Sequence, residues 1–315
     1  MKLSSANALR PAAAFTMIEV AICLAIIGVA LVGIIGVLPR GMNTQRDNRE
    51  ETIVGQDASQ LMEIIRNGAR GQDDLTNYVF AVTNYWYWTN GSGSGFATNG
   101  YTYQNANVAG SPPSANNPYA VIAPINSGSN IVSLLSTPEF MSMGANNFGA
   151  AIPNLLEGGI SNHVVVYMRA LSGMAAEKPP QDNPIMSGDA FSYRVLCVNA
   201  PVAQDAQLWQ GFSYNQGAQV YLGGRFWLAA VPTAATDVPG LSTNWVRSFY
   251  SDQLAAGQRE IRLRFLWPIL PNGDVGNNYQ NFRVTVGGQL MVTNNGLIPP
   301  LLQFYYQPQS FVQIP

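Results

Sequence analysis

The sequence predicts an α+β protein. A long N-terminal helix, transmembrane at its start and amphipathic beyond, precedes a β-rich, loop-rich globular head of mainly antiparallel strands. Three observations support this. The 24 residues from Phe15 to Leu38 contain a single charge, Glu19, and a membrane core needs about 20 apolar residues to be crossed by a helix. Apolar residues then recur with helical spacing as far as Asn67. Beyond that point, short β-branched and aromatic runs alternate with turn residues.

The composition favours a neutral, polar head over a helical cytosolic enzyme. Only 11% of residues are charged and the net charge is -2, whereas soluble domains carry about 25% charged residues. The 30 glycines and 20 prolines favour loops. We therefore expect no nucleic-acid partner, and no motif calls for a cofactor. The two cysteines, Cys23 and Cys197, fall in different elements and predict no disulfide framework.

Residues 1–14 form a short basic leader with Lys2 and Arg10 and no acidic residue. A basic leader before an apolar run is typical of a secretory signal, but the core of such a signal spans only about 7–15 residues. The small residues that end at Ala14 also precede the apolar run instead of following it. Cleavage there would leave the whole run in the mature protein as a permanent anchor.

The sequence Ala14-Phe15-Thr16-Met17-Ile18-Glu19 resembles the processing site of type IV prepilins and type II secretion pseudopilins. The resemblance covers about residues 10–70. It implies that a prepilin peptidase cuts between Ala14 and Phe15, that Phe15 becomes N-methylated, and that Glu19 directs assembly. The family usually has glycine before the cut, where this chain has Ala14, and Met17 replaces the commoner leucine.

The position of Glu19 has its own physical logic. A carboxylate inside a membrane helix costs about 2.5–3.5 kcal/mol on insertion scales. Cleavage would create an ammonium group on Phe15, and Glu19 of a neighbouring helix could neutralise it and fix the axial register of the two subunits. The alternative is a Glu19 that is protonated or reaches the lipid headgroups of the membrane.

The apolar run contains three glycines and is followed by a proline. Gly28, Gly33 and Gly36 would allow close helix packing in lipid, as small residues often do; the alternative is the ordinary tolerance of membrane helices for glycine. Pro39 is predicted to kink or interrupt the helix near Leu38, because proline lacks the backbone N–H that continues a helix.

A second helical stretch is predicted over about residues 43–67. It carries an apolar face with spacings of three, four and seven residues, made of Ile53, Val54, Leu61, Ile64 and Ile65. Its end is expected at Asn67-Gly68 or at Gly71.

Residues 71 to about 117 are aromatic and polar without helical period. The run from Tyr85 to Trp88 either covers a sheet or binds a glycan or another subunit. The Gly/Ser-rich stretch 90–95 is predicted to be a loop, and it lacks the Gly-Lys-Ser/Thr of a phosphate-binding loop.

The rest of the chain is predicted to consist mainly of short strands. The candidates are Tyr119–Ala123, His163–Arg169, Phe191–Val198, Arg225–Ala230, Glu260–Trp267, Phe282–Val286 and Gln289–Val292. Apolar and polar residues alternate strictly over 259–265, and we expect this strand to form a hairpin with 282–286.

Few residues carry a signal for chemistry. His163 is the only histidine and is interpreted as structural. Asp274, in an Asn/Gly-rich loop over 271–278, is a calcium candidate because Ca²⁺ prefers oxygen ligands, although Asn-Gly-Asp is also common turn chemistry.

The sequence therefore predicts a leader over 1–14, a transmembrane and stalk helix over 15–70, and a β-rich head over 71–315. We expect a non-catalytic, pilin-like subunit of a type II secretion or type IV pilus-like filament. Its partners would be a prepilin peptidase, other pilin or pseudopilin subunits, an inner-membrane assembly platform and membrane lipid. The N-terminus would lie in the cytoplasm and the head in the periplasm. The alternatives are a membrane-tethered periplasmic enzyme and a glycan-binding or adhesive domain.

Overall fold

The computed structural model describes residues 15–68, 73–90, 93–102, 121–124, 128–142, 159–172, 191–202, 206–270, 274–294 and 302–307. The chain divides into two compact units, an N-terminal unit up to Glu51 and a β-rich unit from Thr52 onward. The proposed leader, residues 1–14, lies outside the described residues. A long N-terminal apolar helix followed by a β-rich domain with antiparallel sheets is the fold class that the sequence predicts.

Helix α1 spans Met17–Asn67 without a break, with Pro39 inside it. The predicted interruption near Leu38 is therefore wrong, and the two predicted helices are one. Proline removes only the hydrogen bond to the carbonyl four residues earlier, and the helical residues on both sides keep theirs. The predicted end is correct, because Gly68 follows with a φ of +72°, the left-handed conformation that glycine adopts readily after a helix.

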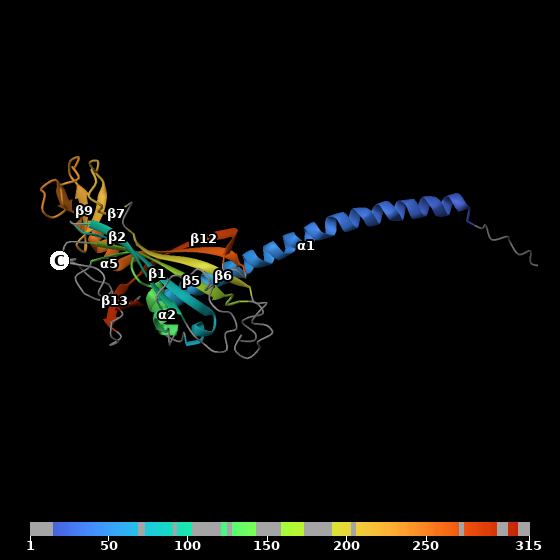
Figure 1. The fold of residues 1–315 in the computed structure, drawn as a ribbon, viewed down its shortest axis with the longest axis horizontal. Coiled ribbons are helices and arrows are strands. Elements are labelled where there is room, and N and C mark those ends of the chain that lie inside the picture. The colour runs from blue at the N-terminus through green and yellow to red at the C-terminus, as the bar shows by residue number, and fades with distance from the viewer. Residues whose placement is uncertain are drawn as a thin grey trace, which may run out of the picture. The chain divides into compact units, whose positions relative to one another are not determined.

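The larger sheet organises the β-rich unit (Figure 1). Its strands are ordered β12-β11-β6-β5-β1-β2-β3, and a short strand, β4, also pairs with β5. The pairs are antiparallel except β2 with β3. In chain order the strands are β1 (Val79–Asn90), β2 (Gly93–Thr102), β3 (Val121–Pro124), β4 (Phe140–Ser142), β5 (Gly159–Arg169), β6 (Ser192–Pro201), β11 (Gln258–Ile269) and β12 (Val275–Gly287).

The strands predicted beyond residue 118 are present, with ends that differ by a few residues. The predicted hairpin is confirmed as β11–β12, in which Arg259 pairs with Val286. The loop predicted over 90–95 is wrong from Gly93 onward, because β1 and β2 form a hairpin through this region. Asn, Gly and Ser have low strand propensity, but here an unbroken ladder from Asn90–Gly93 to Ala81–Thr102 pairs their backbones. Residues 103–117 lie outside the described part of the chain.

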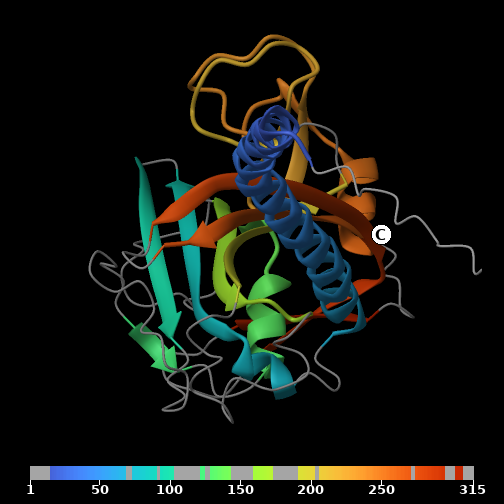
Figure 2. The same cartoon turned by 90° about the vertical axis from the view of Figure 1, so that its right-hand side faces the viewer.

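The core of the β-rich unit lies between the last turns of α1, helix α2 (Gly128–Leu135) and the larger sheet. Figure 2 shows the strands of this sheet arching around α2. The spacing of four, three and four residues that defines one helix face is met by Val54, Ala58, Leu61 and Ile65, all fully buried. Val54, Leu61 and Ile65 were predicted to share this face, whereas Ile53 and Ile64 are only partly buried.

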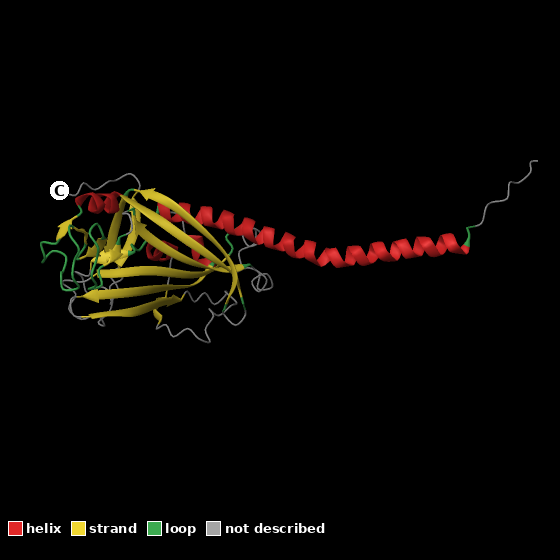
Figure 3. Ribbon diagram, turned by 90° about the horizontal axis from the view of Figure 1, so that it is seen from above, coloured by secondary structure: helices red, strands yellow, loops and turns green. Residues whose placement is uncertain are grey.

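A smaller sheet, ordered β10-β9-β8-β7, has its own core. Its strands are β7 (Gln207–Leu208), β8 (Gln219–Leu222), β9 (Arg225–Ala229) and β10 (Trp245–Arg247). The remaining elements are η1 (Asp73–Asn77), α5 (Phe249–Gly257), β13 (Gln289–Asn294) and β14 (Leu302–Gln307), the last two forming a pair. Strands outnumber helices in this unit, as Figure 3 shows by colour.

Candidate functional site at the start of the N-terminal helix

Thr16 and Glu19 close the first turn of α1. The backbone N–H and the hydroxyl of Thr16 both donate to Oε2 of Glu19, at 2.9 and 2.8 Å. In return, the N–H of Glu19 lies 3.4 Å from the Thr16 hydroxyl. This reciprocal Thr-x-x-Glu arrangement is a capping box, which satisfies N–H groups that a helix start otherwise leaves without partners.

The carboxylate of Glu19 keeps capacity for a second interaction. Both bonds from Thr16 end on Oε2, whereas Oε1 accepts none that involves residues 15–51. A carboxylate offers about four lone-pair sites on its two oxygens. Glu19 can therefore cap its own helix and still accept a hydrogen bond from a cation outside the chain.

The residues of the apolar run of α1 are exposed. Phe15 is 86% exposed and Met17 is 90% exposed, and every residue from Phe15 to Leu38 is exposed. This helix is long and apolar enough to cross a membrane. Burial of apolar surface is worth about 25 cal/mol per Å², so cover of this surface by lipid or by other helices would be favourable.

The glycines of this run leave open notches on the helix. A Cβ atom added at Gly28, Gly33 or Gly36 would meet nothing within 4 Å. Local packing within the chain therefore does not require glycine at these positions. Small residues let another helix approach closely.

A buried carboxylate, not predicted from the sequence, lies at the other end of the helix. Oδ2 of Asp57 accepts hydrogen bonds from the Leu171 N–H at 2.9 Å and from the Tyr193 hydroxyl at 2.8 Å. Burial raises the pKa of the Asp57 carboxyl, and the polar groups of Ser172, Tyr193 and Leu171 beside it partly oppose this rise. Asp57 follows Val54 by three residues and precedes Leu61 by four. An acidic residue within the apolar face of a helix is the sequence signal that indicates a buried carboxylate.

Other predicted site residues are not brought together. Ala14 and residues 271–273 of the proposed calcium loop lie outside the described residues, and in the described part of the chain no three His, Cys, Asp or Glu side chains form a metal-binding group. The backbone carbonyl of Asp274 accepts from the Leu270 N–H at 2.8 Å. His163 lies on β5 with Nε2 3.5 Å from Oε1 of Glu139.

Cys197 and Tyr87 of β1 both lie against other parts of the β-rich unit. Burial raises the pKa of the Cys197 thiol to about 12, and its Sγ donates to the Leu135 carbonyl at 3.3 Å. Such a thiol is not poised to be a nucleophile, which requires a thiolate. Tyr87 packs on the cluster around Phe140 and Tyr221, so it covers apolar surface, one of the two roles expected of this run.

Comparison with known proteins returned no relative. Neither a protein-family description, nor a curated protein, nor a solved structure matches the chain.

Proposed function

We propose that this chain is a non-catalytic, pilin-like subunit of a type II secretion or type IV pilus-like filament. A prepilin peptidase cuts between Ala14 and Phe15, Phe15 is N-methylated, and the N-terminal helices pack side by side. The precursor waits in the inner membrane with its head in the periplasm. Other pilin-like subunits and an inner-membrane assembly platform are its partners.

The observation that carries this proposal is that an exposed apolar helix and a single carboxylate occur together at the start of the mature chain. A helix with an exposed apolar surface begins at Met17, the third residue after the proposed cut, and its first turn holds the only charge of the run. A simple tether needs apolar length but no carboxylate there, because a charge makes insertion harder.

The geometry also supports different roles for the two carboxylate oxygens of Glu19. Oε2 holds the Thr16 N–H and hydroxyl of the same chain, and Oε1 is left to receive the N-terminal ammonium of a neighbour. Two charges that are costly alone in lipid then neutralise each other. The bond would be made only at one axial offset between helices, which sets the register of the assembly.

The mature N-terminus tests the processing step. The full chain is co-expressed with a prepilin peptidase or with an inactive variant of that peptidase, and its intact mass and N-terminal peptide are measured. We expect residues 1–14 to be lost and Phe15 to carry a methyl group only with the active enzyme. Ala14→Gly should be cleaved at least as completely, and Ala14→Leu should be cleaved less. Retention of residues 1–14, or a cut after Leu38, would refute the proposal.

Two variants separate capping from register. Glu19→Gln keeps the capping geometry, since glutamine also serves in a capping box, but removes the charge. Thr16→Val removes the hydroxyl and keeps the charge. We expect Glu19→Gln to lose incorporation into filaments of the native host, measured in sheared and membrane fractions, and Thr16→Val to retain most of it. The reverse order would show that Glu19 acts only on its own helix.

A tethered periplasmic enzyme or a glycan-binding domain is the alternative. The aromatic run of β1 is the feature that suggests glycan binding. One of its rings, that of Tyr87, packs on the cluster that contains Phe140 and Tyr221 and so has a structural role. Saturable binding of a glycan array ligand that is lost in Tyr85→Ala, together with an uncut N-terminus, would favour this alternative.

A further inference from the structure

One face of the larger sheet carries a trough with basic sides. Along β11, Ile261, Leu263 and Phe265 are buried, while Arg262 and Arg264 are exposed on the other face. Arg262 pairs in register with Arg283 of β12 and with Val198 of β6; Arg264 pairs with Asn281 and Leu196. These two arginines and the four residues that pair with them are among those that line a cavity of about 450 Å³.

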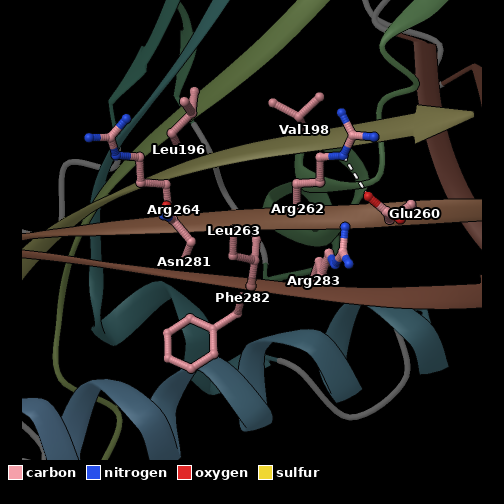
Figure 4. A pocket seen from close by; sticks show the side chains of 9 residues that line it. All are labelled: Leu196, Val198, Glu260, Arg262, Leu263, Arg264, Asn281, Phe282 and Arg283. Carbon is pink, nitrogen blue, oxygen red and sulfur yellow. Dashed lines mark hydrogen bonds and ion pairs between the residues drawn. The ribbon is translucent and has the colours of Figure 1, made fainter. Parts of the chain in front are cut away.

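Figure 4 shows how the side chains divide between the two faces. The guanidinium groups of Arg262, Arg264 and Arg283 and the aliphatic groups of Leu196 and Val198 lie on one side, whereas the Phe282 ring points to the other. The trough therefore has an apolar floor on β6 and basic groups on β11 and β12.

The concentration of charge in the trough is unusual for this chain. The whole sequence has only 16 Lys and Arg, yet three arginines occupy neighbouring positions here. Arg262 and Arg283 stand directly opposite each other, and like charges in that position destabilise a sheet. A charge on an edge strand such as β12 helps to prevent aggregation, but β11 is paired on both sides. Edge protection therefore does not explain Arg262 and Arg264.

Acidic groups within the protein satisfy this charge only in part. Glu260 contacts Nε of Arg262 at 2.6 Å. The Arg264 guanidinium carbon lies 4.7 Å from the centre of the Tyr279 ring, a contact that uses none of its N–H donors in a hydrogen bond to a carboxylate. Among the described residues no carboxylate forms an ion pair with Arg264 or Arg283. The trough holds three positive charges against one negative charge.

The spacing of the arginines fits an extended chain. Arg262 and Arg264 are two residues apart on one strand, about 6.8 Å, which is also the distance between every second side chain of an extended peptide. A guanidinium binds a carboxylate through two parallel hydrogen bonds. The two methylene groups of a glutamate would cover Leu196 and Val198 while its carboxylate reaches the arginines.

We propose that this trough binds an extended acidic segment of a partner protein, with glutamates at alternate positions. The segment lies along β6 and β11, and successive glutamates contact Arg262 and Arg264. Arg283 contributes to both from the facing strand. The proposal does not depend on filament assembly, because it concerns only the β-rich unit.

The test uses the full chain in non-ionic detergent micelles and a fluorescein-labelled (Glu-Thr)₄ peptide, followed by fluorescence anisotropy. We expect saturable binding that weakens as salt rises above about 0.1 M, where charges are screened over about 10 Å. The double variant Arg262→Gln/Arg264→Gln should reduce affinity about tenfold or more, the loss that corresponds to about 1.4 kcal/mol. The charge-matched control Arg66→Gln/Arg225→Gln changes two exposed arginines outside the trough and should reduce it less than about twofold.

Each other outcome would overturn the proposal. The absence of saturable binding, or an equal loss in the control variant, would show that the trough is not a site. Binding of the neutral (Gln-Thr)₄ peptide with equal affinity would show that the arginines do not select acids. Tighter binding of heparin or single-stranded DNA than of the peptide, with the same dependence on Arg262 and Arg264, would assign the trough to a polyanion of another class.

Discussion

The two parts of helix α1 have the same backbone structure and opposite surroundings. From Phe15 to Leu38 every residue is exposed, although nearly all are apolar. From Val54 to Ile65 one face is fully buried in the core of the β-rich unit, and even the polar Asp57 is 0% exposed. The first part has the more hydrophobic sequence and the lower burial.

This difference distinguishes the part of the helix that packs on the protein's own core from the part that does not. The protein's own core stabilises the second part, whose apolar residues occur on one face only. The first part is apolar all round, as expected of a helix surrounded by lipid or by other helices. Substitutions of buried residues in the second part should therefore change the stability of the β-rich unit, whereas substitutions in the first part should leave the stability of that unit unchanged.

The largest expected effect is a difference in stability between variants of two leucines, one in each part of the helix. Leu61→Ala should lower the free energy of unfolding of the β-rich unit by about 2–5 kcal/mol, because it deletes a buried side chain and leaves a cavity. Leu31→Ala, on the exposed part, should change it by less than about 0.5 kcal/mol. Urea unfolding of the full chain in detergent, followed by tryptophan fluorescence, measures both. Similar effects would mean that the two parts are not independent.

The next effect concerns the buried carboxylate. Asp57→Ala removes the acceptor of the Leu171 N–H and the Tyr193 hydroxyl and should cost about 2–4 kcal/mol. Asp57→Asn keeps an amide oxygen that can accept both bonds and should cost less. The same unfolding measurement compares them, and an alanine variant as stable as the asparagine variant would show that these bonds contribute nothing.

The raised pKa of Asp57 also predicts that stability depends on pH. Burial raises the folded-state pKa of Asp57 above its ordinary value of 3.8, so the folded protein binds this proton more tightly than the unfolded chain. Wild-type stability relative to Asp57→Asn should therefore increase as the pH falls through the raised pKa, and level off below 3.8. Unfolding curves of both proteins between about pH 7 and pH 4 test the sign. A relative loss of stability on acidification would contradict it.

A smaller effect is expected at the helix start. Thr16→Val should destabilise the first turn of α1 by about 0.5–2 kcal/mol, the usual cost of losing a cap. The unfolding of the β-rich unit should not change. Amide hydrogen exchange in micelles should speed up for the first turn alone. Faster exchange throughout α1 would show that the cap supports more than its own turn.

The smallest effect on the stability of the isolated chain is expected at the three glycines of the apolar run. Gly33→Ala places a methyl group where nothing lies within 4 Å, and it should stabilise the helix slightly, by about 0.5–1 kcal/mol. Gly33→Leu should behave similarly in micelles. If the notches serve helix packing, only the leucine variant should lower filament incorporation in the native host. Equal incorporation of both would leave the glycine without a packing role.

Much of the fold could be predicted from local patterns. The alternation of Arg262 and Leu263 along β11 predicted both the strand and its buried face, because one face of a sheet is buried and the other is not. The β1–β2 hairpin could not be predicted in this way, since its Asn, Gly and Ser residues favour turns locally and become a strand only through pairing with partners. The interruption predicted at Pro39 does not occur, because a local rule about one hydrogen bond takes no account of the helical residues on either side.

The candidate sites divide in the same way. The sequence alone determined the run from Phe15 to Leu38, the lone Glu19 and the Thr16–Glu19 spacing, because helix length, charge and capping depend on residues close in sequence. Only the tertiary structure decided that Asp57 meets Leu171 and Tyr193 and that Arg262 faces Arg283 across two strands. Those contacts join residues 21 to 136 positions apart, and strand register and packing, not local preference, bring them together.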